Sequence, residues 1–95
     1  MKFISAITCP PSSSYADGIT TAGLGAPDLA LALAQHAAYC AALEALGVQI
    51  TTLPADPAHP DSCFVEDTAV VTANGAILAR PGAPSRAGEV TAMQK

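Results

Sequence analysis

Three carboxylates within seven residues form the densest group of side chains in this sequence that could do chemistry. Asp61, Glu66 and Asp67 belong to the segment Asp-Ser-Cys-Phe-Val-Glu-Asp, which lies between two stretches predicted to be strands. Carboxylates held beside the end of a sheet suit a guanidinium or ammonium group, because the planar paired donors of a guanidinium match carboxylate oxygens. The segment is therefore a candidate cation-binding site.

Two other interpretations of this segment stay open. Aspartate is common in turns, so a solvated acidic loop explains the pattern, and from the pattern alone it is the favoured interpretation. A metal site is the third option, because the segment and the residues before it offer nitrogen, sulfur and oxygen ligands whose spacing matches no recognised zinc pattern. These ligands are His59, Asp61, Cys63, Glu66 and Asp67.

The three cysteines and two histidines form no recognisable catalytic group. Anionic neighbours raise the pKa of Cys63, whereas a nucleophilic thiolate needs positive surroundings. Cys40 and His36 fall on the apolar face of a predicted helix, and Cys9 follows a strand beside two prolines, so we expect structural roles for these three. His59 stands in a proline-rich stretch and is expected to be exposed. No cysteine–histidine or serine–histidine–aspartate spacing here is typical of a catalytic site.

The strands and turns that would position these residues are recognisable from local patterns. Runs of apolar and β-branched residues that end at proline or at turn residues predict strands. The Asn74-Gly75 pair lies between two such runs and predicts a β-hairpin. The four strands are expected over residues 2–8, 48–53, 68–72 and 76–79, with loops over residues 10–28, 54–62 and 80–86.

A long helix is predicted over residues 28–46. Pro27-Asp28 supplies a favourable start and Gly47 a favourable end. The residues expected on its buried face are Leu29, Leu33, His36, Cys40, Leu43 and Leu46. A second helix is expected to begin at about Glu89, with Ser85 as its cap. The order strand, helix, three strands and helix predicts an α/β chain with a single domain over residues 1–95.

Composition excludes several classes of function. The chain has 95 residues, a net charge of −4 and four Lys and Arg residues in all, so it has no basic surface for nucleic acid or anionic membranes. No apolar run approaches the roughly 20 residues that cross a bilayer, and the N-terminal apolar stretch is too short for a secretory signal. An odd number of widely spaced cysteines favours a reducing compartment, so we expect a cytoplasmic protein.

The chain is unusually apolar for its length. Its hydrophobic fraction is 51% and its mean hydropathy is +0.37. A short chain of this kind usually has apolar surface that another domain, another copy or further chain covers. We therefore expect a homo-oligomer or an incomplete domain.

Several motifs in this order resemble the N-terminal part of the dimethylarginine dimethylaminohydrolases, members of the amidinotransferase and arginine deiminase superfamily. The first is Asp-Gly-Ile-Thr over residues 17–20, and a second runs from Gln35-His36 to Leu53-Pro54. The most specific are Pro-Asp-Ser-Cys-Phe-Val-Glu-Asp over residues 60–67 and Arg-Pro-Gly-Ala-Pro-Ser-Arg-Ala-Gly-Glu over residues 80–89. Together they span nearly the whole chain.

The resemblance implies a fold and an activity. The family fold is a five-bladed α/β propeller (pentein) with a central pocket, in which this chain would be one blade-like βαββ unit, a partial domain. The family hydrolyses N-methylated arginines to citrulline and a methylamine, with a cysteine nucleophile and a histidine acid/base and without a metal or organic cofactor. The implied partner is therefore a small molecule, methylated arginine.

The resemblance also assigns residues to the substrate site. Asp61, Glu66 and Asp67 match carboxylates around the guanidinium and amino groups of the substrate. Ile19 matches a pocket-lining position in a lid loop, and Arg86 matches the arginine that meets the substrate carboxylate. The family has a second arginine directly after this one, where the present chain has alanine.

The same resemblance places the catalytic cysteine and histidine outside these 95 residues. The family cysteine lies near the C-terminus of a much longer chain, and its histidine lies midway along that chain. We therefore expect no catalytic residue here and an inactive chain. Two alternatives stay open: a non-catalytic module that binds guanidino compounds or self-associates, and a fragment of an arginine deiminase or amidinotransferase.

Overall fold

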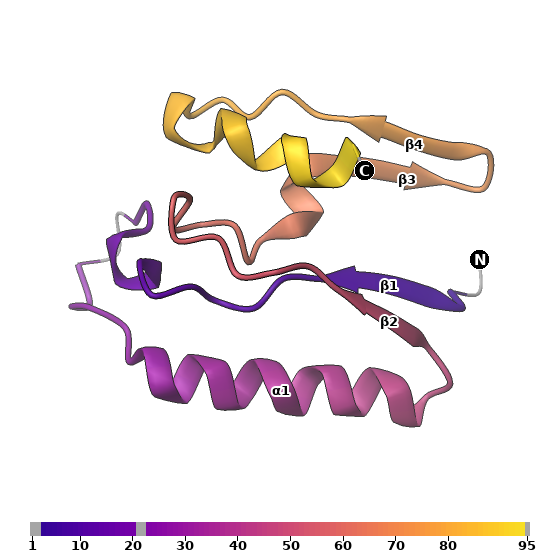
Figure 1. Ribbon diagram of the computed structural model, residues 1–95, viewed down its shortest axis with the longest axis horizontal. Helices are drawn as coiled ribbons and strands as arrows, with labels where there is room; N and C mark the ends of the chain where they lie inside the picture. The colour runs from indigo at the N-terminus through magenta and orange to yellow at the C-terminus, as the bar shows by residue number, and fades with distance from the viewer. Residues whose placement is uncertain (1–2, 21–22, 95) are drawn as a thin grey trace.

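The first half of the chain folds as a β–α–β unit. In the computed structural model, which describes residues 3–20 and 23–94, strands β1 (Ser5–Thr8) and β2 (Gln49–Thr52) pair in parallel. Helix α1 (Leu29–Ala45) connects them and lies along one side of the pair (Figure 1). Parallel neighbours need a crossover of this kind, because a tight turn cannot join them.

The ends of α1 agree with the sequence prediction. The Asp28 carboxylate accepts a hydrogen bond from the Leu31 N–H at 3.1 Å, which satisfies one of the free amides of the first turn. Gly47 follows the helix with φ of +86°, a conformation that glycine adopts without steric cost. The predicted helix is thus confirmed to within one residue at each end.

The predicted apolar face of α1 is wrong at two positions. Leu33 is 40% exposed because the half-buried stripe passes through Ala32 instead, and Leu46 is 79% exposed because the stripe ends at Leu43 and Leu46 follows the last residue of the helix. The half-buried helix residues are Leu29, Ala32, His36, Cys40 and Leu43.

The second half of the chain contains a β-hairpin between two helical segments. Strands β3 (Ala69–Thr72) and β4 (Gly75–Leu78) pair antiparallel through a two-residue turn, which confirms the predicted hairpin, although the turn is Ala73-Asn74 and Gly75 already begins β4. The short 3₁₀ helix η2 (Val65–Thr68) precedes it, and the 3₁₀ helix η3 (Pro84–Gln94) follows it. The prediction that the last helix begins at Glu89 is wrong, because regular helical structure starts five residues earlier and includes Arg86.

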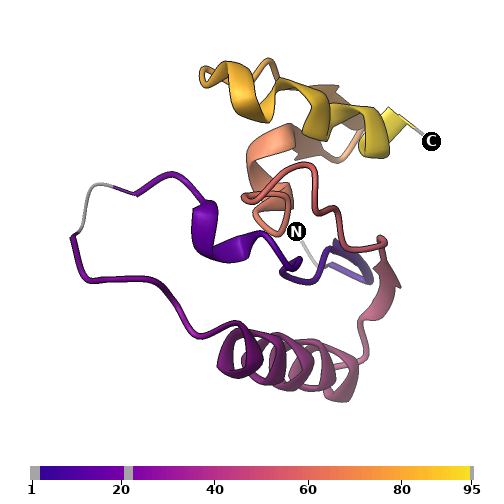
Figure 2. The ribbon, with the colours of Figure 1, turned by 60° about the vertical axis from the view of Figure 1, so that its left-hand side comes forward.

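The strands form two separate sheets among the described residues. β1 and β2 make one two-stranded sheet, and β3 and β4 make another. Figure 2 shows α1 on one side of the parallel pair and the hairpin with η3 on the other. The predicted mixed α/β content is confirmed. The predicted order of one strand, one helix and three strands is present along the chain, and these four strands form two sheets.

Few apolar side chains are buried. Among the described residues Cys9 and Val90 form the buried hydrophobic core, Pro11 is also buried, and the other buried side chains are polar or charged. Residues 2–8 were expected to form a buried strand, yet Phe3 and Ile4, before β1, and Ile7, within it, are 63%, 72% and 45% exposed. Lys2 lies outside the described residues. Burial is wrongly predicted for these side chains, because β1 pairs with β2 alone in a sheet of two strands among the described residues. Within the described ranges, no helix is both long and apolar enough to span a bilayer.

Candidate functional site

The structure brings together four of the five side chains expected in the substrate site. Ile19, Asp61, Asp67 and Arg86 line one cavity of about 580 Å³. Ile19 comes shortly after η1 (Tyr15–Asp17), and Asp61 comes from the loop before η2. Asp67 lies on η2 and Arg86 on η3, so four segments separated in sequence meet at this cavity.

Asp61 anchors the loop that carries Ile19. The Ile19 N–H donates a hydrogen bond to Asp61 Oδ2 at 2.9 Å, and Asp61 is 8% exposed. The chain passes so close to this carboxylate that a Cβ atom at Gly18 would lie 2.5 Å from Asp61 Oδ1. Gly18 has φ of −63°, so what requires glycine here is the close approach and not the backbone conformation.

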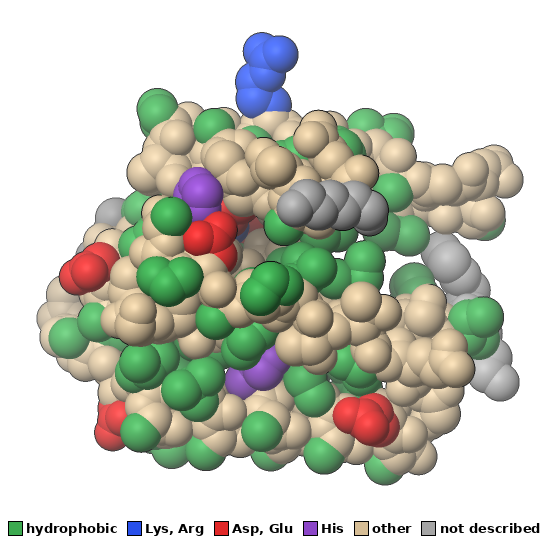
Figure 3. All heavy atoms as spheres, in the orientation of Figure 1, with side chains coloured by type: hydrophobic (Ala, Val, Ile, Leu, Met, Phe, Trp, Pro, Cys, Tyr) green, Lys and Arg blue, Asp and Glu red, His purple; other side chains and the backbone are tan. Residues whose placement is uncertain are grey.

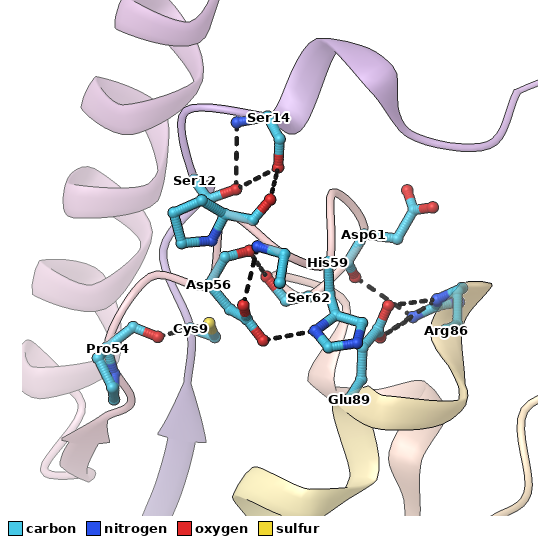
Figure 4. Close-up of polar contacts among 12 residues, drawn as sticks. Cys9, Ser12, Ser14, Pro54, Asp56, His59, Asp61, Ser62, Arg86 and Glu89 are labelled. Atoms are coloured by element: carbon cyan, nitrogen blue, oxygen red, sulfur yellow. Dashed lines mark hydrogen bonds and ion pairs between the residues drawn. The ribbon is translucent and has the colours of Figure 1, made fainter.

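Arg86 is the most extensively bonded side chain of the site. Its Nε donates to both oxygens of Glu89, at 3.2 and 3.0 Å, and its Nη2 donates to Glu89 Oε1 at 2.9 Å. Nη1 donates to Asp67 Oδ2 at 2.9 Å. Nη2 also faces the main-chain oxygens of Asp61, at 3.3 Å, and Phe64, at 3.5 Å. Figure 4 shows the Glu89 carboxylate facing Arg86, while the Asp61 side chain points away from it.

These contacts fix the charge of Arg86. Hydrogen bonding to Glu89, followed by that to Asp67, raises the pKa of Arg86 above its ordinary value. A second guanidinium, that of Arg80, also belongs to the cavity lining. Two carboxylates and two arginines therefore line the cavity, a composition that suits a ligand with both a cationic and an anionic end.

Glu66 lies outside this cavity. It lines a second cavity of about 610 Å³ together with Cys9, Cys63 and His36. Consecutive residues of a 3₁₀ helix point about 120° apart, because the helix has three residues per turn. Glu66 and Asp67 are neighbours in η2 and so face different sides of it.

The two thiols nearest the acidic segment are poor nucleophiles. Burial, with smaller contributions from Cys9 and nearby carboxylates, raises the pKa of Cys63 to about 11. Burial also raises the pKa of Cys9, which is 3% exposed and whose Sγ donates to the Pro54 carbonyl oxygen at 3.6 Å. The predicted direction for Cys63 is confirmed, although burial contributes more than the anionic neighbours.

His59 is not the exposed loop residue that the sequence predicts. Its Nδ1 lies 2.7 Å from Asp56 Oδ2, and its side chain is 22% exposed. The ring lies directly under η3, where a Cβ atom at Gly88 would be 2.5 Å from His59 Nε2. His36, by contrast, is half-buried on α1 as expected, with Nε2 3.6 Å from Cys40 Sγ. Within residues 3–20 and 23–94 no cluster of three or more metal-ligating side chains is present.

Three residues of the site were not identified from the sequence. Glu89 could have been found from its i,i+3 spacing to Arg86, but only if the helix had been predicted to start before Arg86. Arg80 and Gly18 stood inside recognised motifs without an assigned role. Nothing in the local pattern shows that Gly18 touches a carboxylate 43 positions away.

Comparison with known proteins confirms the resemblance drawn from the motifs. The chain is 49% identical over 85 residues to a dimethylarginine dimethylaminohydrolase of Pseudomonas aeruginosa and 44% identical over 88 residues to one of Streptomyces coelicolor. Each alignment covers 90% of this chain, but 34% and 33% of the respective relatives. The chain thus spans about a third of the length of the curated relatives it matches. No family model matches it.

Solved structures give the same result for the fold. The structure of the Pseudomonas aeruginosa enzyme in complex with citrulline superposes with a TM-score of 0.95 at 47% identity, over 99% of this chain and 37% of that one. A dimethylarginine dimethylaminohydrolase adduct with S-methyl-L-thiocitrulline superposes equally well, over 98% of this chain and 37% of that one. The described fold is therefore the fold of the matching third of these enzymes.

The contact between Gly18 and Asp61 can be tested by adding one methyl group. We expect Gly18→Ala to displace the Asp61 carboxylate and to break its bond to the Ile19 N–H, because the new Cβ would lie 2.5 Å from Oδ1. Amide hydrogen exchange at Ile19 should then accelerate by at least tenfold. Gly82→Ala is the matched control, because Gly82 lines the same cavity and a Cβ there meets nothing within 4 Å. Unchanged exchange at Ile19 in Gly18→Ala would contradict the assignment.

The buried thiol gives a prediction about pH. In the wild-type chain, alkylation of Cys63 by iodoacetamide, followed by peptide mass spectrometry, should increase with pH towards a midpoint near 11, because only the thiolate reacts. At pH 8.5 we expect the rate at Cys63 to be about a hundredfold below that of the same chain unfolded in urea, where the thiol has its ordinary pKa. Equal rates in the folded and unfolded states would show that the pKa of Cys63 is not raised.

Proposed function

We propose that this chain forms one wall of the substrate site of a dimethylarginine dimethylaminohydrolase-like protein. Such a protein hydrolyses N-methylated arginine to citrulline and a methylamine. The observation that carries the proposal is the cavity lined by Ile19, Asp61, Asp67 and Arg86, four of the residues that the motifs assigned to the substrate. The superposed structure that holds citrulline, at a TM-score of 0.95, supports the same ligand class.

The acidic and basic side chains of the cavity would contact opposite ends of the ligand. Asp67 is 53% exposed at its side chain, so its carboxylate can accept a bond from a cationic group while it still contacts Arg86. Asp61 holds the Ile19 segment against the cavity through its carboxylate. Arg86 would bind the substrate carboxylate. Glu66 lies outside this cavity, so its assignment to the substrate site rests on the family resemblance alone.

The bond-breaking groups of the reaction would come from outside these residues. In the reaction, oxygen from water replaces the methylamine on the guanidinium carbon, and the amine leaves with a proton. A cysteine nucleophile and a histidine acid/base are needed for this step in the family. The raised pKa values of Cys9 and Cys63 argue against either as the nucleophile. Cys40 Sγ is engaged with Thr8 Oγ1 at 3.7 Å, and no cofactor is proposed.

The proposal also concerns the fold to which this chain belongs and the cellular compartment of the protein. We infer that residues 1–95 are one blade-like part of a five-bladed α/β propeller. The exposed apolar side chains of both sheets support this inference, because neighbouring blades would cover them. Three free cysteines favour a reducing compartment such as the cytoplasm.

Ligand binding by the chain is the direct test. Titration calorimetry should give heat for asymmetric dimethylarginine with the wild-type chain. Asp67→Asn should weaken binding by about tenfold or more, because a charge-assisted hydrogen bond is replaced by a neutral one. Glu44→Gln on the exposed side of α1 removes the same charge far from the cavity and should bind as wild type does. Equal affinity for wild type and Asp67→Asn would remove Asp67 from the site, and no heat with wild type would contradict the proposal.

Self-association is a second candidate function, favoured by the exposed apolar side chains. Figure 3 shows hydrophobic side chains spread over much of the face that spans both halves of the molecule. Val71 is 63% exposed and lines the second cavity together with Ile7 and Tyr39. A second copy that covers the face around this second cavity would bury side chains which are costly to leave in water.

Light scattering after size exclusion distinguishes self-association from a lone chain. If copies pair through this face, the measured mass should exceed the monomer value of 9.5 kDa and increase with concentration. Val71→Lys should then return the chain to a monomer, because it places a charge in the apolar contact. Ala38→Lys, on the exposed side of α1, is the control and should leave the mass unchanged. A wild-type mass of 9.5 kDa at all concentrations would eliminate this candidate.

A further inference from the structure

A buried carboxylate behind the ligand cavity has no role in the function described so far. Glu89 is 5% exposed, and its side chain is 2% exposed. A carboxylate removed from water to this extent needs strong partners, because its desolvation is costly. Its partner is Arg86, one helical turn earlier in η3, whose Nε and Nη2 both donate to it.

Counting hydrogen-bond donors shows what this contact leaves for a ligand. A guanidinium has five N–H groups in a rigid plane. The Nε–H is directed at Glu89, and the two N–H groups of Nη2 are directed at Glu89 and at the Asp61 and Phe64 carbonyl oxygens. One N–H of Nη1 is directed at Asp67. Among the described residues, a single N–H on Nη1 is therefore left for a ligand.

The segment that carries Glu89 is held in place by its neighbour. Gly88 lies against the His59 ring so closely that a Cβ atom there would be 2.5 Å from Nε2. The ring is in turn held by Asp56, whose Oδ2 lies 2.7 Å from His59 Nδ1 (Figure 4). Through this contact η3 packs against the loop that precedes η2, and this packing determines where the Glu89 carboxylate lies.

We propose that Glu89 is a positioning residue: it holds the Arg86 guanidinium in the cavity wall so that one Nη1 N–H faces the carboxylate of an amino-acid ligand. This inference rests on the proposed function, because it assumes that such a ligand occupies the cavity. Glu89 does not touch the ligand itself. It sets the direction of Arg86 because it holds the Nε edge of the guanidinium, which neither Asp67 nor the Asp61 and Phe64 carbonyl oxygens contact.

The Nε–H of Arg86 reports on this role directly. The chain has two arginines, and Arg80 makes no hydrogen bond or ion pair within the described ranges, so it serves as an internal reference. In ¹⁵N NMR spectra, exchange of the Arg86 Nε–H with water should be at least tenfold slower than that of Arg80. In Glu89→Gln this difference should shrink to within threefold, whereas Glu44→Gln should retain it. Glu89→Asp keeps the buried charge but shortens the reach, so it should give an intermediate rate if Glu89→Gln fails to fold. Protection of Arg86 that survives both substitutions at Glu89 would overturn the proposal.

A pair of ligands separates positioning from a merely structural role. Dimethylarginine has the α-carboxylate that Arg86 would meet, and N,N-dimethylguanidine lacks it. We expect Glu89→Gln to weaken dimethylarginine binding by tenfold or more while dimethylguanidine binding changes by less than threefold. An equal loss for both ligands would show that Glu89 only supports the fold, and would overturn the proposal. If the wild-type chain binds neither ligand, the proposed function fails, while Nε–H exchange still decides whether Glu89 positions Arg86.

Discussion

One guanidinium holds the candidate site together. Arg86 on η3 bonds to a buried carboxylate of its own helix, to Asp67 on η2 and to carbonyl oxygens of the loop that precedes η2. Three segments with little apolar contact between them are thereby fixed around one group. Breaking a buried pair of this kind by removing one partner costs about 3–5 kcal/mol, because a charge is left without a partner away from water. The geometry of the cavity depends on this group more than on the hydrophobic core.

The sequence predicts well the structure that is decided locally. Asp28 and Gly47 mark the ends of α1 because capping depends on a few adjacent residues. The hairpin is likewise predicted from a turn pair between two β-branched runs. The exposure of Ile4 and Ile7 could not be predicted in this way, because apolar content indicates a strand but not how many layers cover it.

The candidate site is predicted only in part, for the same physical reason. Charge and motif identified Asp61, Asp67 and Arg86, and the structure places them around one cavity. The close approach of Gly18 to Asp61 spans 43 positions and depends on how two loops pack, which no local pattern encodes. Glu66 and Asp67 are adjacent in η2, and adjacent residues of a 3₁₀ helix point about 120° apart, so only one of the two lines this cavity. Which of the two faces the cavity depends on how η2 packs, and the sequence does not show this.

The distribution of buried groups explains how the candidate site keeps its shape on a fold with many exposed apolar side chains. Hydrophobic burial acts through area, so apolar faces that stay exposed contribute little to stability. Ion pairs and hydrogen bonds act at single atoms, and the Arg86, Glu89 and Asp67 contacts all lie within one short stretch of chain. One further hydrogen bond, from the Ile19 N–H to the buried Asp61 carboxylate, attaches the segment that carries Ile19 to the same site. The polar network that shapes the cavity therefore holds its geometry without relying on the exposed apolar faces. The cavity wall is preorganised by contacts between single atoms and not by the burial of apolar area.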